Sequence, residues 1–270
     1  MTRDNRFTSL ARLGFAARGL VYILIGWFAL DAAINGGRPI DNQGALGTMA
    51  EAPMGRALLA LCAMGFAGYA FWRLTEAWTD PERRGRDMKG AFERIGYALS
   101  GLTHVGLAIL SGRLALRETP RSQGTPGDAS AQGWSAWLLD QPGGVLLLVL
   151  VGLGFGAVAA AQAIKAYKAR FDELGGDVPA PDSVRLIGRC GYAARALIFL
   201  IVGWFLTSAA LAHDADQAGG LGEALRQLRA QPYGALLLGI VALGLGLFGL
   251  FSLVEARYRR IRVVRPGLLR

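Results

Sequence analysis

Residues 13–34 read LGFAARGLVYILIGWFALDAAI, and the charged residues among them are Arg18 and Asp31. A helix of this length rises about 33 Å, which is enough to cross the ~30 Å hydrocarbon core of a bilayer. Its apolar residues surround the helix axis, whereas a soluble helix has an apolar stripe and a polar back. The segment therefore predicts a transmembrane helix, and it is too long for the apolar part of a cleaved signal peptide.

Similar apolar segments recur five more times along the 270-residue chain. Charged residues make up 18% of the sequence, below the roughly 25% of an ordinary soluble domain. Barrel strands are excluded, because they alternate polar and apolar residues over roughly 10 positions. We therefore expect an all-α membrane protein with six transmembrane helices. The predicted spans are Leu13–Ile34, Pro53–Trp78, Ile95–Leu116, Val145–Tyr167, Cys190–Ala212 and Pro232–Val254.

The beginning of the first span is repeated twice. Residues 12–19 read RLGFAARG, residues 94–101 read RIGYALSG and residues 189–196 read RCGYAARA. The second span of each pair begins with a Pro-x-Gly motif, at residues 53–55, 142–144 and 232–234. Matches at both helix starts predict three tandem copies of one helical hairpin. The copies cover residues 1–93, 94–188 and 189–270, and the third ends in a basic tail.

Each copy contains two spans, so all three copies enter the membrane in the same direction. Such parallel repeats are related by an axis along the membrane normal. The simplest packing is a pseudo-threefold ring of hairpins, and a linear row is the alternative. Because helices in lipid associate through close backbone approach at small residues, glycines in the spans are expected to mark packing faces. These glycines are Gly65, Gly152, Gly154, Gly156 and Gly244.

A short segment of mixed polar and apolar character precedes each Pro-x-Gly motif. It contains Leu46 and Met49 in the first copy, Trp134 and Trp137 in the second, and residues 221–229 in the third. Apolar residues at helical spacing, with tryptophan among them, predict short helices that lie in the outer membrane interface. A re-entrant gate is the alternative.

The basic residues are distributed unevenly between the two sides of the predicted membrane. An even number of spans places both termini on one side, and 22 of the 29 Lys and Arg residues lie there. Under the positive-inside rule this side is the cytoplasm. The net charge of +9 then reflects orientation and attraction to anionic headgroups. We expect membrane lipids as partners at the cytoplasmic face, and no nucleic acid.

Two positions inside the spans carry charges, which by default indicate function at membrane depth. They hold Arg18 and Glu76 in the first copy, Ser100 and Lys165 in the second, and Arg195 and Glu255 in the third. The acid is absent where the arginine is absent, so we hypothesise that each arginine forms an ion pair with the glutamate of its own hairpin. Reversing both charges should then restore folding lost in either single reversal. Snorkelling to headgroups and a site for an anionic headgroup or solute are the alternatives.

His104 lies about a third of the way along the third span. We expect it to make an interhelical hydrogen bond, with a proton relay or a haem ligand as alternatives. His213, the other histidine, falls at the outer end of the fifth span, so the two cannot ligate one haem. The sequence has no nucleophile elbow, metal motif or phosphate-binding glycine loop. We therefore expect no cofactor, no metal and no enzymatic activity.

The repeated string of Arg, Gly, aromatic residue and Ala, with the later Pro-x-Gly, resembles the bacterial family known as domain of unknown function 1206. The likeness covers Arg12–Trp78, Arg94–Tyr167 and Arg189–Tyr258. The resemblance implies tandem two-span repeats, commonly three per chain. It indicates no biochemical mechanism, because the function of the family is unknown. The middle copy departs from the pattern at Ser100 and Lys165, which argues against three equivalent sites.

These features favour a non-catalytic component of the bacterial inner membrane that acts through lipid, a membrane protein partner or a second copy of itself. The alternative is a permeation or carrier protein for a small solute or ion, using an axis among the hairpins. A water-accessible central cavity lined by Arg18, Ser100 and Arg195 would favour the carrier. A close-packed apolar axis with lipid-sized grooves would favour the binding protein.

Overall fold

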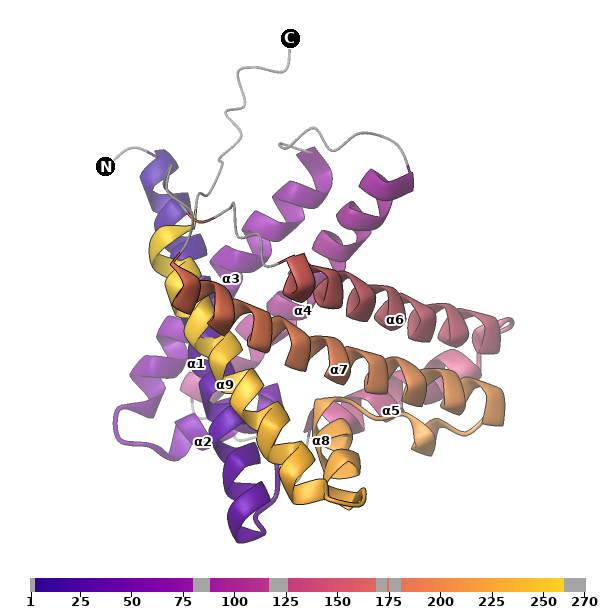
Figure 1. Ribbon diagram of the computed structural model, residues 1–270. Helices are drawn as coiled ribbons and strands as arrows, with labels where there is room; N and C mark the ends of the chain where they lie inside the picture. The colour runs from indigo at the N-terminus through magenta and orange to yellow at the C-terminus, as the bar shows by residue number, and fades with distance from the viewer. Residues whose placement is uncertain (1–2, 80–87, 117–125, 169–173, 175–180, 260–270) are drawn as a thin grey trace.

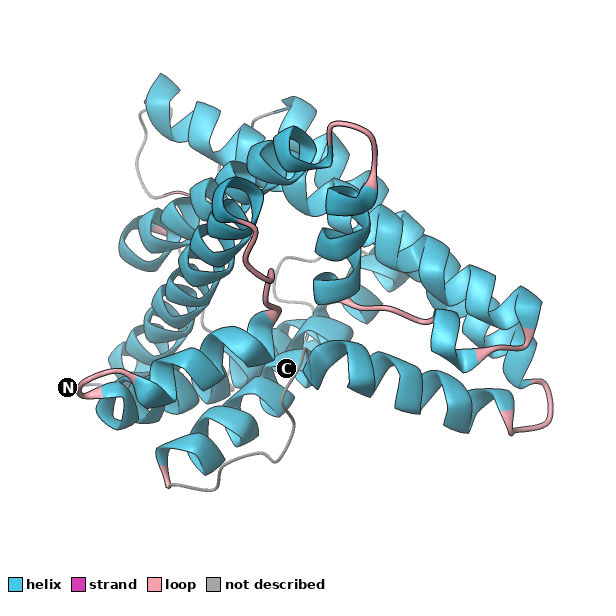
Figure 2. Ribbon diagram, turned by 90° about the horizontal axis from the view of Figure 1, so that it is seen from below, coloured by secondary structure: helices cyan, strands magenta, loops and turns pink. Residues whose placement is uncertain are grey.

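The computed structural model describes residues 3–79, 88–116, 126–168, 174 and 181–259. Within these residues the chain is helical, without a strand and with one isolated β-bridge between Leu174 and Arg259 (Figure 2). Most of the basic tail that the sequence predicts lies outside the described residues. In chain order the elements are α1 Arg3–Asn35, α2 Asn42–Glu51, α3 Gly55–Thr79, α4 Met88–Ala115, α5 Pro126–Leu139, α6 Gly144–Lys168, α7 Asp182–Ala212, the 3₁₀ helix η1 Ala215–Gln217, α8 Leu221–Ala230 and α9 Gly234–Tyr258.

Six of the described helices, α1, α3, α4, α6, α7 and α9, are long and apolar enough to cross a membrane. A short helix lies between the two long helices of each copy, so the order long, short, long occurs three times. The predicted all-α fold with six spans is therefore confirmed. Many large apolar side chains of the long helices face outward, as Leu236, Ile240 and Leu243 do on α9. Such a surface suits hydrocarbon, because soluble proteins rarely expose wide apolar patches.

The Pro-x-Gly motif turns the chain back from each short helix into the next long one. Its middle residue has a left-handed backbone, with φ of 59° at Met54, 77° at Gly143 and 60° at Tyr233. A Cβ at Gly55 would lie 1.8 Å from the carbonyl oxygen of Met49, near the end of α2. The same clash with the preceding short helix would arise at Gly144 and Gly234, at 1.8 and 1.9 Å. Only glycine allows this approach, which explains why the motif recurs.

The long helices pair mainly across repeats and not within them. α3 packs along α4, α6 along α7 and α9 along α1, so each pair joins the second span of one copy to the first span of another. Figure 1 shows α1 and α9 side by side and antiparallel, with the α6 and α7 pair running across them. α1 also packs on α3 and α7 on α9, whereas the described parts of α4 and α6 do not pack along each other. The long helices thus follow the order α1, α3, α4, α6, α7, α9 and back to α1. The break in this cycle lies between α4 and α6 of the middle copy.

Some of the glycines named from the sequence lie where helices touch. A Cβ would lie 2.8 Å from the Leu13 carbonyl oxygen at Gly65, 2.9 Å from the Gly203 carbonyl oxygen at Gly152, and 2.5 Å from the Ala194 Cβ at Gly244. The expectation needs correction at Gly154 and Gly156, where an added Cβ would meet no atom within 4 Å. α6 makes its close approach to α7 at Gly152, and Gly154 lies on another side of the helix. Gly156 takes part only through its backbone, since its nitrogen lies 3.3 Å from a Cβ built at Gly203.

We predict that Gly152→Ala destabilises the protein by about 1–3 kcal/mol, because the new methyl group would press on the backbone of α7. Gly154→Ala, two residues along the same helix, should be neutral or stabilising by up to ~1 kcal/mol through helix propensity. Thermal unfolding of both purified variants in one detergent provides the comparison. Equal losses of stability in both variants would contradict the packing at Gly152.

Candidate functional site

Arg18 is buried on α1, where its guanidinium contacts two other long helices. One nitrogen forms an ion pair with Glu255 on α9. Its Nε donates to the Ser252 hydroxyl at 3.2 Å, and a second terminal nitrogen donates to the Tyr69 hydroxyl on α3 at 3.0 Å. Arg18 therefore joins the first helix of the chain to α3 and to the last helix.

Two further arginines extend this network. The Tyr69 hydroxyl also accepts a hydrogen bond from Arg73 at 3.0 Å, and Arg73 donates to Glu76 at 2.7 Å. Arg259 donates to the second carboxylate oxygen of Glu255 at 2.5 Å. Buried charges are tolerated when they are paired and hydrogen-bonded in this way. We call this group the arginine–glutamate cluster. Its members are Arg18, Tyr69, Arg73, Glu76, Ser252, Glu255 and Arg259.

The pairing proposed from the sequence must be corrected. Arg18 binds Glu255 of the third copy and not Glu76 of its own hairpin, and Glu76 binds Arg73 one turn away on α3. The reason is that α1 lies directly on α9. A Cβ at Gly19 would lie 2.8 Å from the carbonyl oxygen of Gly249, so the two backbones are nearly in contact here. The ion pair therefore joins two repeats.

The helix pairing gives a rule for all three copies. In each pair, the first long helix of one repeat packs along the second long helix of another. The arginine position on the first of these helices faces the glutamate position on the second, as Arg18 on α1 faces Glu255 on α9. For α4 the corresponding residue is Ser100, opposite α3. For α7 it is Arg195, and the residue at the glutamate position of α6 is Lys165. The complete Arg and Glu combination is thus available only where α1 meets α9.

Arg195 occupies the same repeat position as Arg18 but has no carboxylate partner among the described residues. The expected pair with Glu255 does not form, since that carboxylate is held by Arg18 and Arg259. Within the described part of the chain, no acidic group lies at ion-pair distance from Arg195, and its Nε is buried without a hydrogen-bond partner. The guanidinium carbon lies 4.3 Å from the centroid of the Phe248 ring. Cation–π contact only partly replaces an anion.

His104 and Lys165 of the middle copy contact different neighbours. His104 Nδ1 lies 2.7 Å from the backbone oxygen of Ser100 in its own helix, so the expected interhelical hydrogen bond is not seen. The His104 ring instead packs on Tyr69 of α3, with 4.4 Å between centroids. Lys165 Nζ lies 4.6 Å from the centroid of Tyr192 on α7. In the described residues no three His, Cys, Asp or Glu side chains gather as metal ligands.

A cavity of about 450 Å³ lies among α1, α6, α7 and α9 and extends outward to α5 and α8. Its walls are largely apolar, and Arg195 and Asn42 belong to the lining. The side-chain oxygen of Asn42 is buried without a hydrogen-bond partner. Trp134 and Trp137 on α5 also line the cavity and are 69% and 55% exposed, so the cavity opens on this side. The cavity brings together Arg195 and apolar side chains from all three copies.

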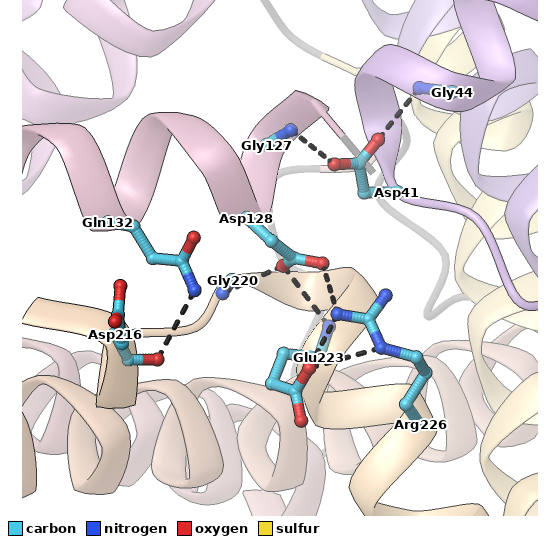
Figure 3. A network of polar contacts seen from close by, with 9 residues as sticks. All are labelled: Asp41, Gly44, Gly127, Asp128, Gln132, Asp216, Gly220, Glu223 and Arg226. Carbon is cyan, nitrogen blue, oxygen red and sulfur yellow. Dashed lines mark hydrogen bonds and ion pairs between the residues drawn. The ribbon is translucent and has the colours of Figure 1, made fainter. Parts of the chain in front are cut away.

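Asp41 connects the short helices of the first two copies, as Figure 3 shows. One carboxylate oxygen accepts from the N–H of Gly44 at 2.7 Å and caps α2. The other accepts from the N–H of Gly127, at the start of α5, at 2.6 Å. Burial raises the pKa of the Asp41 carboxyl above its ordinary value, although the two N–H donors oppose this effect. A buried carboxylate is therefore used to fix one short helix against another.

Asp128 on α5 makes the corresponding connection to the third copy (Figure 3). One oxygen accepts from the N–H groups of Gly220 and Glu223 at 2.9 and 3.1 Å, at the start of α8. The other oxygen accepts from Arg226 at 2.9 Å. Partial burial alone would lower the pKa of Arg226, but its bonds to Glu223 and Asp128 raise it overall. The cap of α8 is thus supplied by another repeat.

The connection from the third copy back to the first closes the cycle. Arg229 on α8 donates to the carbonyl oxygen of Gly37, two residues after the end of α1, at 2.6 Å. Thus α2 contacts α5, α5 contacts α8, and the bond from Arg229 ties α8 to the loop between α1 and α2. Gly220 and Leu221, at the start of α8, also line the cavity. The polar network therefore fixes the outer wall of the cavity.

Comparison with known sequences agrees with this threefold layout. The profile of a family described as Domain of Unknown Function (DUF1206) matches residues 13–80, 95–169 and 190–259. The chain belongs to the DUF1206 family. It is similar to the uncharacterized protein YxxB of Bacillus subtilis (strain 168), with 36% identity over 254 residues, 93% of this chain and 90% of that protein. No solved structure matches the chain.

Sequence reasoning missed several residues of this DUF1206 protein. Asp41 precedes a short amphipathic segment, which is a usual N-cap signal and could have been recognised. Asp128 could not, because it caps a helix that starts 93 residues later in another copy. Tyr69 aligns with Phe248 in the third repeat. Because phenylalanine has no hydroxyl group, the repeat pattern gave no sign that the Tyr69 hydroxyl forms hydrogen bonds.

A double-mutant cycle tests the corrected ion pair. We predict that Arg18→Met and Glu255→Gln show a coupling of roughly 1–3 kcal/mol in the free energy of unfolding, because the groups are in direct contact. Arg18→Met with Glu76→Gln is the matched control and should show a clearly smaller coupling. A larger coupling in the control cycle would restore the hairpin pairing inferred from the sequence.

A second prediction concerns the cap that Asp128 provides for α8. Asp128→Ala should cost about 1–3 kcal/mol, because the partly buried N–H groups of Gly220 and Glu223 lose their acceptor. Hydrogen exchange at Gly220 and Glu223 should accelerate. Asp140→Ala, at an exposed position just after α5, is the control and should leave both exchange rates unchanged. Unchanged protection at Gly220 in Asp128→Ala would count against this connection.

Proposed function

We propose that this DUF1206 protein is a non-catalytic multi-pass component of the bacterial inner membrane, with both termini in the cytoplasm, which binds membrane lipid between its helices. The single observation that carries the proposal is the cavity of about 450 Å³ among α1, α6, α7 and α9. Ligand sites are typically concave and mostly apolar, with a few polar groups that orient the ligand. The cavity has this composition, with Arg195 and Asn42 in an apolar lining.

The position of the cavity also supports a lipid ligand. It lies among helices that are long and apolar enough to span a bilayer, and its mouth is bordered by the exposed Trp134 and Trp137. Tryptophan favours the level of the headgroups, so these side chains suit the entrance to an intramembrane site. A lipid could enter from the bilayer without crossing water.

The orientation rests on charge. Most Lys and Arg residues lie on the side of the termini, which the positive-inside rule assigns to the cytoplasm. Anionic headgroups at that face are further expected partners. The three short helices then lie at the outer face, because each connects the outer ends of two spans.

Permeation along a central axis has less support. That alternative expects Arg18, Ser100 and Arg195 to line one water-accessible cavity. Arg18 instead lies buried in the arginine–glutamate cluster, and only Arg195 of the three belongs to the cavity lining. An apolar cavity that contains only one of these three residues fits a binding protein better than a carrier.

Extraction of the protein in native membrane patches, followed by mass spectrometry, tests the proposal. Wild-type protein should carry a stoichiometric lipid. Val202→Phe should lose it, because Val202 is a buried residue of the cavity wall and the larger ring fills the space. Leu200→Phe changes a neighbouring residue of α7 that is 57% exposed and outside the lining, so it should keep the lipid.

Thermal unfolding shows whether Val202→Phe remains folded. Absence of a bound lipid from wild type, or equal lipid content in both phenylalanine variants, would overturn the proposal. Co-purification of a protein subunit without lipid would favour the protein-partner form of the hypothesis instead.

A further inference from the structure

The cavity is lined by one charged side chain for which the described part of the chain supplies no counter-charge. Of the described residues that line it, Arg195 alone is charged, and the other polar groups, such as Asn42 and Ser135, are neutral. The Arg195 Nε is buried without a hydrogen-bond partner, and no described carboxylate pairs with the guanidinium. Arg195 as a whole is half-buried, and a partly desolvated charge without a partner is costly in an apolar environment. An anionic ligand would remove that cost.

The repeat explains why the partner is missing. At the equivalent place between α1 and α9, the carboxylate of Glu255 binds Arg18. Between α6 and α7 the glutamate position is held by Lys165, so the chain supplies a second cation in place of the anion. Arg18 and Arg195 also lie against the same ring, with their guanidinium carbons 5.1 and 4.3 Å from the Phe248 centroid. Among the described residues Arg195 therefore lacks the carboxylate that the chain supplies to Arg18.

The dimensions of the cavity limit the ligand. The lining on α7 runs from Arg195 to Leu206, 11 residues apart along the helix, which is ~16 Å at 1.5 Å per residue. A dry cavity of about 150 Å³ holds one benzene molecule, so about 450 Å³ corresponds to roughly 18 non-hydrogen atoms. One alkyl chain with a small headgroup fits this volume, whereas a two-chain phospholipid is far larger.

The ligand can enter from the side. Val151 on α6 and Trp137 on α5 line the cavity and are 43% and 55% exposed. The described part of α4 does not pack along α6, although the corresponding spans of the first and third copies do pack together. The break in the middle copy thus leaves this side uncovered, toward the bilayer.

We propose that the cavity binds a single-chain amphiphile with an anionic headgroup, such as a fatty acid carboxylate, with the headgroup on Arg195 and the alkyl chain running along α7 toward α5. This inference rests on the proposed lipid-binding function and specifies its ligand. The headgroup takes the place that Glu255 occupies in the equivalent pair. The chain contacts the apolar residues of α7, including Ile198, Val202 and Leu206.

Native mass spectrometry of the full-length protein in a nonionic detergent tests this, with dodecanoate and dodecanol as probes. Wild type should bind one dodecanoate at least ~tenfold more tightly than dodecanol, because a hydrogen bond to a charged group is the difference between them. Arg195→Gln should abolish this preference. Arg185→Gln, at an exposed site on the same helix, should preserve it.

A second variant replaces the ligand's charge with one from the chain. Lys165→Glu restores the glutamate of the repeat beside Arg195, so it should weaken dodecanoate binding to the level of dodecanol and raise thermal stability. Lys168→Glu makes the same charge change one turn further along α6 and should leave the preference intact.

Equal binding of the two probes by wild type, or a preference that survives Arg195→Gln, would overturn the inference. If a phospholipid co-purifies and Val202→Phe removes it while dodecanoate shows no advantage, the proposed function stands and the ligand class is wrong. If wild type carries no lipid and binds neither probe, both proposals fail.

Discussion

The contact between α1 and α9 is the constraint on which the rest of the architecture depends. It brings the first and the last long helix together, so three hairpins that follow one another in sequence acquire a cyclic order. In a bilayer the hydrophobic effect contributes little to helix association, and backbone proximity must supply contact energy. Gly19 and Gly249 allow that proximity, because a Cβ on either would collide with the backbone of the other helix. Beside them, Arg18 and Glu255 pair in the space that the close approach leaves.

The three repeats pair their long helices in the same way, but their sequences differ. As a result, the helices of the first and third copies are closely packed, whereas the side between α4 and α6 of the middle copy is open. The first and third copies have long helices that pack together within the copy as well as across copies, whereas the described parts of α4 and α6 do not. The middle copy also lacks both charged residues of the pattern, at Ser100 and Lys165. The open side and the cavity therefore arise where the sequence departs from the repeat. The bonds of Asp41, Asp128 and Arg229 fix the positions of the short helices at the outer end of the cavity.

The fold could be predicted largely because its determinants are local. The length of an apolar run is a property of consecutive residues, and the Pro-x-Gly motif recurs because each turn needs a left-handed residue and a glycine against the preceding short helix. The partner of Arg18 could not be predicted in this way. Glu76 and Glu255 occupy the same repeat position, and the choice between them depends on which helix lies beside α1. Spacing within a hairpin favoured Glu76, whereas packing between repeats selected Glu255.

This distinction between local pattern and packing also separates the two equivalent arginines. Arg18 and Arg195 share a motif and a repeat position, but one meets a carboxylate of the chain and the other borders an apolar cavity with Lys165 at the carboxylate's repeat position. A buried ion pair is weak evidence of net stabilisation, and removing the partner of a buried charge is destabilising. Arg195 is half-buried and packs on the Phe248 ring, a contact that only partly replaces an anion. The binding function that we propose gives its charge a role, the attraction of an anion from outside the chain. Under that proposal, duplication of one hairpin gives a structural arginine in the first copy and a binding arginine in the third.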